Sequence, residues 1–313
     1  MPHHVLTKDQ ANGSFSAQQE PVLRVRAGGG DRITFRTDDL AYAQMEETRD
    51  LAHVTATINP VTGPVFVEGA EPGDALAVTI HDIELAEEGW SVYIPGAGAL
   101  AGVMGSAMMV RRVPVREGRV HLLPTLDVPV APMLGCIGVA PADGDASTVM
   151  PSYPTGGNMD LTYAQPGATV FLPVEVPGAL LSIGDIHAVM SRGESSFVAI
   201  EIAGAATVSL DVVPKLNLTA PQIDTGSEYV CVGLGDPVQD SVVMAYESMF
   251  ALLTRHGYTP EDAYVVMSAV AHTELGGPTG SVAPDPLHPL RAVGAVTVAR
   301  ISKHILTQSP APA

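Results

Sequence analysis

Short runs of alternating apolar and polar residues fill the first two thirds of the chain, and Gly or Pro separates the runs. This pattern is typical of half-buried β-strands joined by tight turns. We therefore expect strands at residues 31–35, 75–80 and 119–123, and the same rhythm returns over residues 168–213. The first thirty residues are polar and end in a predicted turn.

Two regions show no regular hydrophobic period. Residues 37–55 are rich in Asp, Glu and Thr, and we expect irregular structure there. Residues 132–160 carry Gly or Pro every few positions and are expected to be mostly loop. Loops of that length in a compact domain are usually functional, so the second region is a candidate for the site.

The pattern becomes helical after Asp236, which has the form of an N-cap followed by Pro237 at the first helical position. Apolar residues then recur at helical spacing up to Gly257, a plausible C-terminal cap. Thr259 begins a second predicted helix, which carries the apolar positions Tyr264, Val265, Met267 and Val270. The clean amphipathic pattern favours packing over chemistry. A Gly/Pro-rich loop at residues 275–292, an apolar strand at 293–301 and a mobile tail are expected to follow.

These elements predict a β-rich α/β fold, with mixed β-sandwich or barrel-like subdomains and a C-terminal helical hairpin. We expect residues 1–313 to form a single domain. A division into two β subdomains, about 1–130 and 131–313, is a further interpretation that one sequence does not demonstrate.

The net charge of −18 argues against nucleic acid and anionic membrane surfaces as partners, because little positive charge is present to neutralise phosphates. The N-terminus lacks the apolar core of a signal peptide, and no apolar run is long enough to span a bilayer. We therefore expect a soluble, cytoplasmic protein. Cys136 and Cys231 lie in apolar contexts and are expected to be buried free thiols.

Several catalytic schemes are disfavoured by missing motifs. The sequence has no Gly-x-Ser-x-Gly elbow, no Walker loop, and no lysine beside a serine or cysteine nucleophile pattern. Carboxylate and histidine chemistry remains, and a zinc-like site needs about three such ligands and an open position. Candidates lie in or beside turn-rich segments: His53, Glu68, Asp160, Asp185, His187 and Glu201.

Two glycine-flanked clusters concentrate these donors. Thr155-Gly-Gly-Asn-Met-Asp160 supplies Asn158 and Asp160, and Gly184-Asp-Ile-His-Ala188 supplies Asp185 and His187. Taken alone, each cluster is explained equally well by a structural turn and by a functional site. A histidine is more often hydrogen-bonded or exposed than a ligand, although the Gly-Asp corner favours His187. Both clusters together indicate a site.

Four ordered segments resemble signatures of the acetamidase/formamidase family over roughly residues 5–300. The segments are Pro60-Val-Thr-Gly-Pro-Val-Phe-Val-Glu-Gly-Ala-Glu-Pro-Gly-Asp74, Pro132-Met-Leu-Gly-Cys-Ile-Gly-Val-Ala-Pro141, Gly156-Gly-Asn-Met-Asp160 and Gly184-Asp-Ile-His-Ala188. The resemblance implies hydrolysis of a short amide such as formamide or acetamide, a β-rich α/β fold, and a homodimer or higher oligomer. It also implies a divalent metal, with zinc first and calcium second. By position, Asn158, Asp160, Asp185 and His187 inherit the site, with Glu68 and Glu194 beside it.

The segment after the last signature departs from the family. The family typically continues Gln-Gly-Asp-Gly-Glu, whereas this chain reads Met190-Ser-Arg-Gly-Glu194. Arg192 would bind a carboxylate on a larger substrate, as arginine often does. Near the C-terminus, where the family often carries an aspartate, His272 and Glu274 are replacement ligands or, more simply, exposed polar residues.

Our hypothesis from the sequence is metal-assisted amide hydrolysis. Asp160, Asp185, His187 and His53 are the candidate metal ligands; Glu68 and Glu194 are candidate proton carriers; and Asn158 is the third catalytic candidate. Backbone N–H groups of Gly156 and Gly157 would stabilise the oxyanion, and Arg192 would contact substrate. The alternatives are hydrolysis of another linear C–N bond, in a ureide, guanidino compound or larger amide, and a binding protein whose site has drifted.

Overall fold

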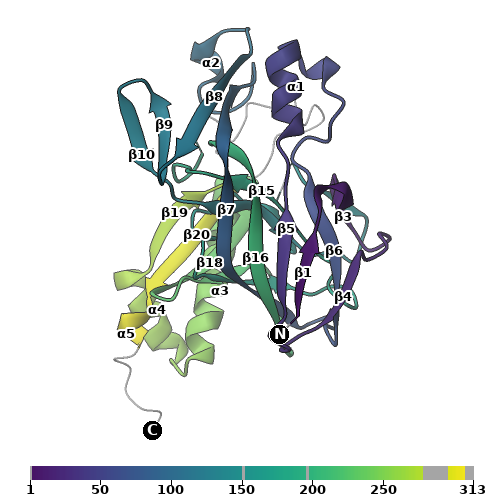
Figure 1. The fold of residues 1–313 in the computed structure, drawn as a ribbon. Helices are drawn as coiled ribbons and strands as arrows, with labels where there is room; N and C mark the ends of the chain where they lie inside the picture. The colour runs from purple at the N-terminus through teal and green to yellow at the C-terminus, as the bar shows by residue number, and fades with distance from the viewer. Residues whose placement is uncertain (1, 150–151, 195–196, 278–294, 307–313) are drawn as a thin grey trace.

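The computed structural model describes residues 2–149, 152–194, 197–277 and 295–306, and all its strands except β3 and β12, which pair with each other, belong to one extensive sheet (Figure 1). The expected β-rich fold is confirmed, and the described strands form no closed barrel. The predicted loop at 275–292 and the predicted mobile tail fall largely outside the described residues.

Two long antiparallel strands run through the middle of the molecule (Figure 1). β7 (Ala75–Tyr93) pairs with β16 (Glu201–Val213) from Ala75 opposite Val213 to Trp90 opposite Glu201. β7 also pairs with β14 (Thr169–Pro173) and β8 (Met109–Arg116). Alternate residues of these strands enter the main hydrophobic core, where Leu76, Val78 and Ile80 are buried. Each such side chain contributes about 1.5–3 kcal/mol by leaving water.

The remaining N-terminal elements surround this pair. They are β1 (His3–Leu6), η1 (Lys8–Gln10), β2 (Ala11–Asn12), β3 (Ser14–Ser16), β4 (Leu23–Arg26), β5 (Arg32–Arg36), α1 (Leu40–Thr48), η2 (Leu51–His53), β6 (Val61–Glu68), α2 (Ala101–Met104), β9 (Arg119–Leu123) and β10 (Leu126–Pro129). The predicted strands at 31–35, 75–80 and 119–123 are confirmed by β5, β7 and β9.

A second set of strands carries the glycine-flanked motifs. β15 (Leu181–His187) pairs with β11 (Met133–Gly138) on one side and with β6 on the other. β11 in turn pairs with β13 (Gly156–Asn158), and β12 (Asp145–Ser147) pairs with β3. Strands from both sides of residue 130 therefore pair directly in one sheet.

The C-terminal part packs helices against a sheet. β18 (Glu228–Gly235) pairs with β17 (Gln222–Asp224) and β20 (Ala295–Ser302), and β20 also pairs with β19 (His272–Gly276). α3 (Val238–Arg255) packs on β18 and β20 through Ala245, Met249, Leu252 and Leu253. α4 (Pro260–Val270) follows, and α5 (Lys303–Leu306) ends the described chain. The predicted helical hairpin (α3 and α4) and the predicted closing strand (β20) are both confirmed.

The structure corrects several details of the predicted elements. Residues 37–55 contain α1, which the hydrophobic period did not reveal because only Ala41 and Met45 of this helix are buried. Residues 132–160 contain three short strands within the predicted loop, and every residue of β11 is buried. α3 begins one residue later than expected, after Pro237. On α4, Tyr264 and Val265 point outward at 72% and 63% exposure, so these two do not pack.

Both cysteines are free and buried, as expected. No helix among the described residues combines the length and the apolar character needed to cross a bilayer.

Candidate active site

Five titratable side chains converge where β15 ends and β16 begins. Asp185 and His187 come from β15, and His187 lies directly opposite Glu201, the first residue of β16. Asp160 follows β13, and Glu194 lies on the segment after β15. The sheet pairing therefore brings both glycine-flanked motifs to one place, as the sequence predicted.

The imidazole of His187 is at the centre of this cluster. Its Nε2 atom lies 3.3 Å from Asp185 Oδ1, 3.2 Å from Glu201 Oε2 and 3.8 Å from Asp160 Oδ1. One ligand atom from each of Asp160, Asp185 and His187 fits within a 4.8 Å span, and the same holds for His187, Glu194 and Glu201. These side chains are almost fully buried.

Three of the four acids have left-handed backbone conformations. The φ angles of Asp160, Asp185 and Glu194 are 47°, 55° and 38°. Such conformations are uncommon for residues other than glycine and persist where the surroundings over-determine them, which is frequent at functional sites. The fold therefore holds these three carboxylates against a local conformational cost.

Gly135 on β11 makes room for two of the carboxylates. A Cβ atom at this position would lie 2.5 Å from Asp160 Oδ1 and would also overlap Asp185 Oδ2. The Gly135 carbonyl accepts hydrogen bonds from the N–H groups of Met159, at 3.0 Å, and Asp160, at 3.1 Å. The absence of a side chain at 135 is thus what allows the two acids to approach each other.

Burial and mutual repulsion perturb these acids strongly. Burial, then the charge of Asp185, raises the pKa of Asp160 well above its ordinary value. Burial and the charge of Asp160 do the same to the pKa of Glu194, and burial raises the pKa of Glu201. Burial would lower the pKa of His187, but the carboxylates of Glu201 and Asp185 outweigh it and raise that pKa well above normal. Burial would raise the pKa of Asp185, but the charge of His187 and hydrogen bonds with His187, Glu201 and Asn59 together lower it.

The cluster fits a divalent cation. Four carboxylates around one imidazole cannot all ionise in a buried site without added positive charge. Within the described chain, Asp160 Oδ1 and both ring nitrogens of His187 are buried without a hydrogen bond of regular geometry, although Nε2 lies within ion-pair distance of Asp185 and Glu201. Buried polar atoms are normally paired, so these atoms are suited to hold a ligand. An imidazole beside carboxylates matches the donors that zinc takes, whereas calcium prefers oxygen alone.

A cavity of about 40 Å³ adjoins the cluster. Asp160, Asp185, Glu194 and Glu201 form its polar wall. Apolar residues from separate segments also line the cavity, among them Met45, Ile58, Ile94, Val149, Phe197 and Val198. The cavity is therefore lined both by carboxylates and by apolar side chains.

Two amides and a phenol complete the lining. Asn59 Nδ2 donates to Asn158 Oδ1 at 2.9 Å and to the Thr148 carbonyl at 2.8 Å, and Asn158 Nδ2 donates to the Val149 carbonyl at 2.8 Å. Tyr42 is hydrogen-bonded to Glu201, and burial followed by that carboxylate's charge raises its pKa well above normal. Tyr42 therefore keeps its proton and acts as a donor.

Four of the residues predicted from sequence lie elsewhere. Glu68 is exposed at the end of β6 beside Arg26, 3.7 Å away, and His53 is exposed and bonded to Asp50. Neither belongs to the buried cluster. Gly156 and Gly157 do not line the cavity, and the N–H of Gly156 donates to the Tyr153 carbonyl at 2.8 Å.

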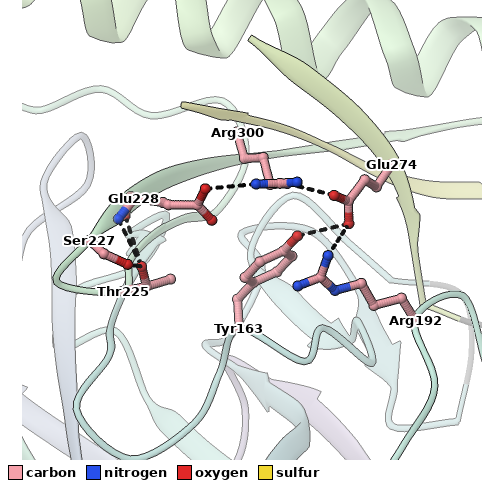
Figure 2. A network of polar contacts seen from close by, with 7 residues as sticks. All are labelled: Tyr163, Arg192, Thr225, Ser227, Glu228, Glu274 and Arg300. Carbon is pink, nitrogen blue, oxygen red and sulfur yellow. Dashed lines mark hydrogen bonds and ion pairs between the residues drawn. The ribbon is translucent and has the colours of Figure 1, made fainter. Parts of the chain in front are cut away.

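Arg192 also lies outside the cavity lining. Its Nη1 atom donates to Glu274 Oε2 at 2.9 Å, and its guanidinium lies over the Tyr163 ring (Figure 2). The carboxylate partner that the sequence suggested for Arg192 is therefore supplied by the protein itself.

Sequence reasoning did not find Tyr42, Asn59 or Gly135, and it named Glu201 as a candidate without giving it a role in the site. A carboxylate within the apolar run at 197–202 is a usable signal for Glu201, since a buried charge needs a partner. The other three carry no distinguishing pattern, because only the tertiary fold brings Tyr42 and Asn59 to the cavity and Gly135 against the carboxylates.

Comparisons with known proteins identify relatives of this chain in sequence and in fold. A model of the Acetamidase/Formamidase family matches residues 19–144 and 95–277. A crystal structure of a predicted acetamidase/formamidase from Thermoanaerobacter tengcongensis is 30% identical, with a TM-score of 0.86 and coverage of 98% of this chain and 97% of that one. The structure of an acetamidase from Bacillus halodurans is 28% identical, with a TM-score of 0.86 and coverage of 97% and 99%.

The curated relatives match over a shorter stretch. An acetamidase of Mycolicibacterium smegmatis is 29% identical over 220 residues, which is 50% of this chain and 54% of that protein. The chain thus spans about half the length of the curated relatives it matches. With the family model covering well over half of the sequence, the chain belongs to the acetamidase/formamidase family.

Proposed function

We propose that this protein hydrolyses a short aliphatic amide, of the formamide or acetamide type, to a carboxylate and ammonia with the help of a divalent metal. The observation that carries the proposal is the small cavity of about 40 Å³ walled by four buried carboxylates. A site for one water molecule takes roughly 10–15 Å³, so this space suits a molecule of a few non-hydrogen atoms.

Asp160, Asp185 and His187 would hold the metal, because they offer three ligand atoms close together and two of these residues have buried atoms without a hydrogen bond of regular geometry. When bound, a divalent cation would lower the pKa of a water molecule and polarise the amide carbonyl. The donor set favours zinc over calcium.

Glu194 is our candidate for the proton carrier. It lines the cavity, and burial with the nearby charge of Asp160 raises its pKa toward the range in which a carboxyl group can both accept and release a proton. It would take a proton from the attacking water and return it to the departing nitrogen. Tyr42 would orient Glu201 through their hydrogen bond, and Asn59 would hold Asn158 against the cavity.

The apolar wall would bind the acyl group and exclude bulk water. This favours a short amide over a ureide, a guanidino compound or a larger amide. The cavity also argues against a drifted binding protein, since the acids, the histidine and the lining are all retained in one place.

A substrate series tests the size argument. Rates should fall from formamide and acetamide to propionamide in the unaltered protein. Ile94→Ala, which trims the cavity wall, should raise the rate on propionamide relative to formamide. Ile80→Ala removes a buried isoleucine that does not line the cavity and should leave that ratio unchanged. Equal turnover of all chain lengths by the unaltered protein would contradict the assignment.

A cytoplasmic location and a homo-oligomeric state remain predictions. The outward-facing Tyr264 and Val265 on α4 support an interface between copies. Sedimentation of the purified protein, compared with a Tyr264→Lys variant, would test it.

A further inference from the structure

Three donors converge on the partly buried carboxylate of Glu274 (Figure 2). Glu274 Oε2 accepts hydrogen bonds from the Tyr163 hydroxyl and from Arg192 Nη1, both at 2.9 Å. Its other oxygen, Oε1, accepts from Arg300 Nε at 2.6 Å. The carboxylate therefore has a partner on each oxygen, and one of its oxygens joins two different segments of chain.

Those two segments carry site residues. Tyr163 lies three positions after Asp160, and Arg192 lies two positions before Glu194. Glu274 is fixed on β19, opposite Val298 of β20. At the end of the same strand, the N–H of Gly277 donates to the Asp160 carbonyl at 3.1 Å. The β19 strand thus contacts the Asp160 segment twice and the Glu194 segment through Arg192.

Direct contact between Arg192 and Tyr163 strengthens this connection. The guanidinium carbon of Arg192 lies 5.1 Å from the centre of the Tyr163 ring, within the range of a cation–π interaction. Glu274 is only 22% exposed, although Arg192 is 54% exposed. The planar guanidinium of Arg192 stacks on the Tyr163 ring and donates to the Glu274 carboxylate, so its orientation is more restricted than that of an isolated surface charge.

The Glu194 segment needs such support. Glu194 has a φ angle of 38°, a conformation that persists only where surrounding contacts over-determine it. Its own N–H donates to the Ser191 carbonyl at 3.1 Å, which closes a tight turn around Arg192. Fixing Arg192 at the outside of this turn therefore fixes the direction in which Glu194 points.

We propose that Arg192, Glu274 and Tyr163 form a clamp that sets the position of Glu194 relative to Asp160. Arg192 is a positioning residue and does not bind substrate. This proposal rests on the proposed function in one respect, which is that Glu194 takes part in the reaction. Its structural part, the restraint on the 191–194 turn, is independent of what the site catalyses.

The test compares Arg192→Met and Glu274→Gln with a matched control, Glu228→Gln. Glu228 bonds Arg300 at 2.7 Å on the far side of the same network and touches neither site segment. Displacements of the order of 1 Å cost up to ~10²-fold in rate, so we expect Arg192→Met to lower kcat about tenfold. KM should change less, and Glu228→Gln should keep kcat within about twofold of the unaltered enzyme.

Hydrogen–deuterium exchange tests the structural effect of the clamp independently of any catalytic activity. The Glu194 amide should exchange faster in Arg192→Met and Glu274→Gln than in Glu228→Gln, whether or not an amide substrate has been found. Arg192→Lys, which keeps the charge but loses the planar fork, should recover only part of the protection. Unchanged exchange in both clamp variants would overturn the proposal. So would loss of activity confined to acidic amides, which would make Arg192 a substrate-binding residue instead.

Discussion

Replacing Gly135 by alanine tests the site geometry with a single added methyl group. The added Cβ would stand 2.5 Å from Asp160 Oδ1 and 2.9 Å from the carboxyl carbon of Asp185. Gly135 has no left-handed φ angle, so alanine brings no backbone strain of its own. The effect of the substitution must therefore come from the clash with these two side chains.

The required movement can be worked out from the structure. Ordinary contact begins at 3.4 Å, so Asp160 Oδ1 must recede by about 0.9 Å. Metal–ligand distances tolerate only about 0.2 Å. Both clashing groups are side-chain ends, which can yield while the strands stay paired. We therefore expect a loss of about 1–3 kcal/mol in the free energy of unfolding, as for ordinary overpacking. Turnover should fall by ~10²-fold or more, with weakened metal binding.

The assay measures ammonia release, zinc affinity by chelator competition, and thermal unfolding on the same preparations. Gly102→Ala is the control, because nothing lies within 4 Å of an added Cβ at that position. It should leave all three quantities close to those of the unaltered protein. If Gly135→Ala kept both turnover and zinc affinity, the reasoning that Asp160 and Asp185 hold the metal would be refuted.

Three further variants probe separate parts of the account. Glu194→Gln should reduce kcat at least ~10²-fold while zinc affinity changes little, and Glu68→Gln, at an exposed carboxylate, should keep normal kinetics; loss of zinc from Glu194→Gln would instead make Glu194 a ligand. His187→Ala should abolish both zinc binding and turnover, and retention of stoichiometric zinc by that variant would exclude His187 as a ligand. Burial would raise the pKa of Glu274, but hydrogen bonds from Arg300 and Tyr163 and the charges of Arg192 and Arg300 together hold it below its ordinary 4.5. Glu274 therefore stabilises the fold above pH 4.5, and this stability is lost as the pH falls through its lowered pKa. The stability difference between the unaltered protein and Glu274→Gln should shrink over that range in urea unfolding; a constant difference would contradict the ion pairing.

Strand and helix periods were sufficient to predict most of the architecture. They failed at α1, whose buried face is limited to Ala41 and Met45, too small to produce a helical period. They also did not reveal β11, which lies in the region that we expected to be mostly loop because Gly or Pro recurs every few residues. Within a strand, Gly135 instead provides space for carboxylates, which is a tertiary role that local patterning does not encode.

The candidate site was predictable where its residues share short motifs. Asp160, Asp185 and His187 lie in the glycine-flanked clusters, and the pairing of β11 with β13 and β15 brings those clusters together. Glu68 was selected because it lies in a motif, yet its side chain points to solvent beside Arg26. Tyr42 was missed because its position on an irregular-looking segment gives no sign that the segment covers the cavity.

The most direct test of metal-assisted amide hydrolysis is to measure ammonia release with and without the metal. Purified protein would be assayed with formamide, acetamide, propionamide and one acidic amide, before and after chelation and after zinc is restored. The account predicts release from the two shortest amides that chelation abolishes and zinc restores. No release from any amide by folded, zinc-loaded protein, or release that chelation leaves unchanged, would contradict it.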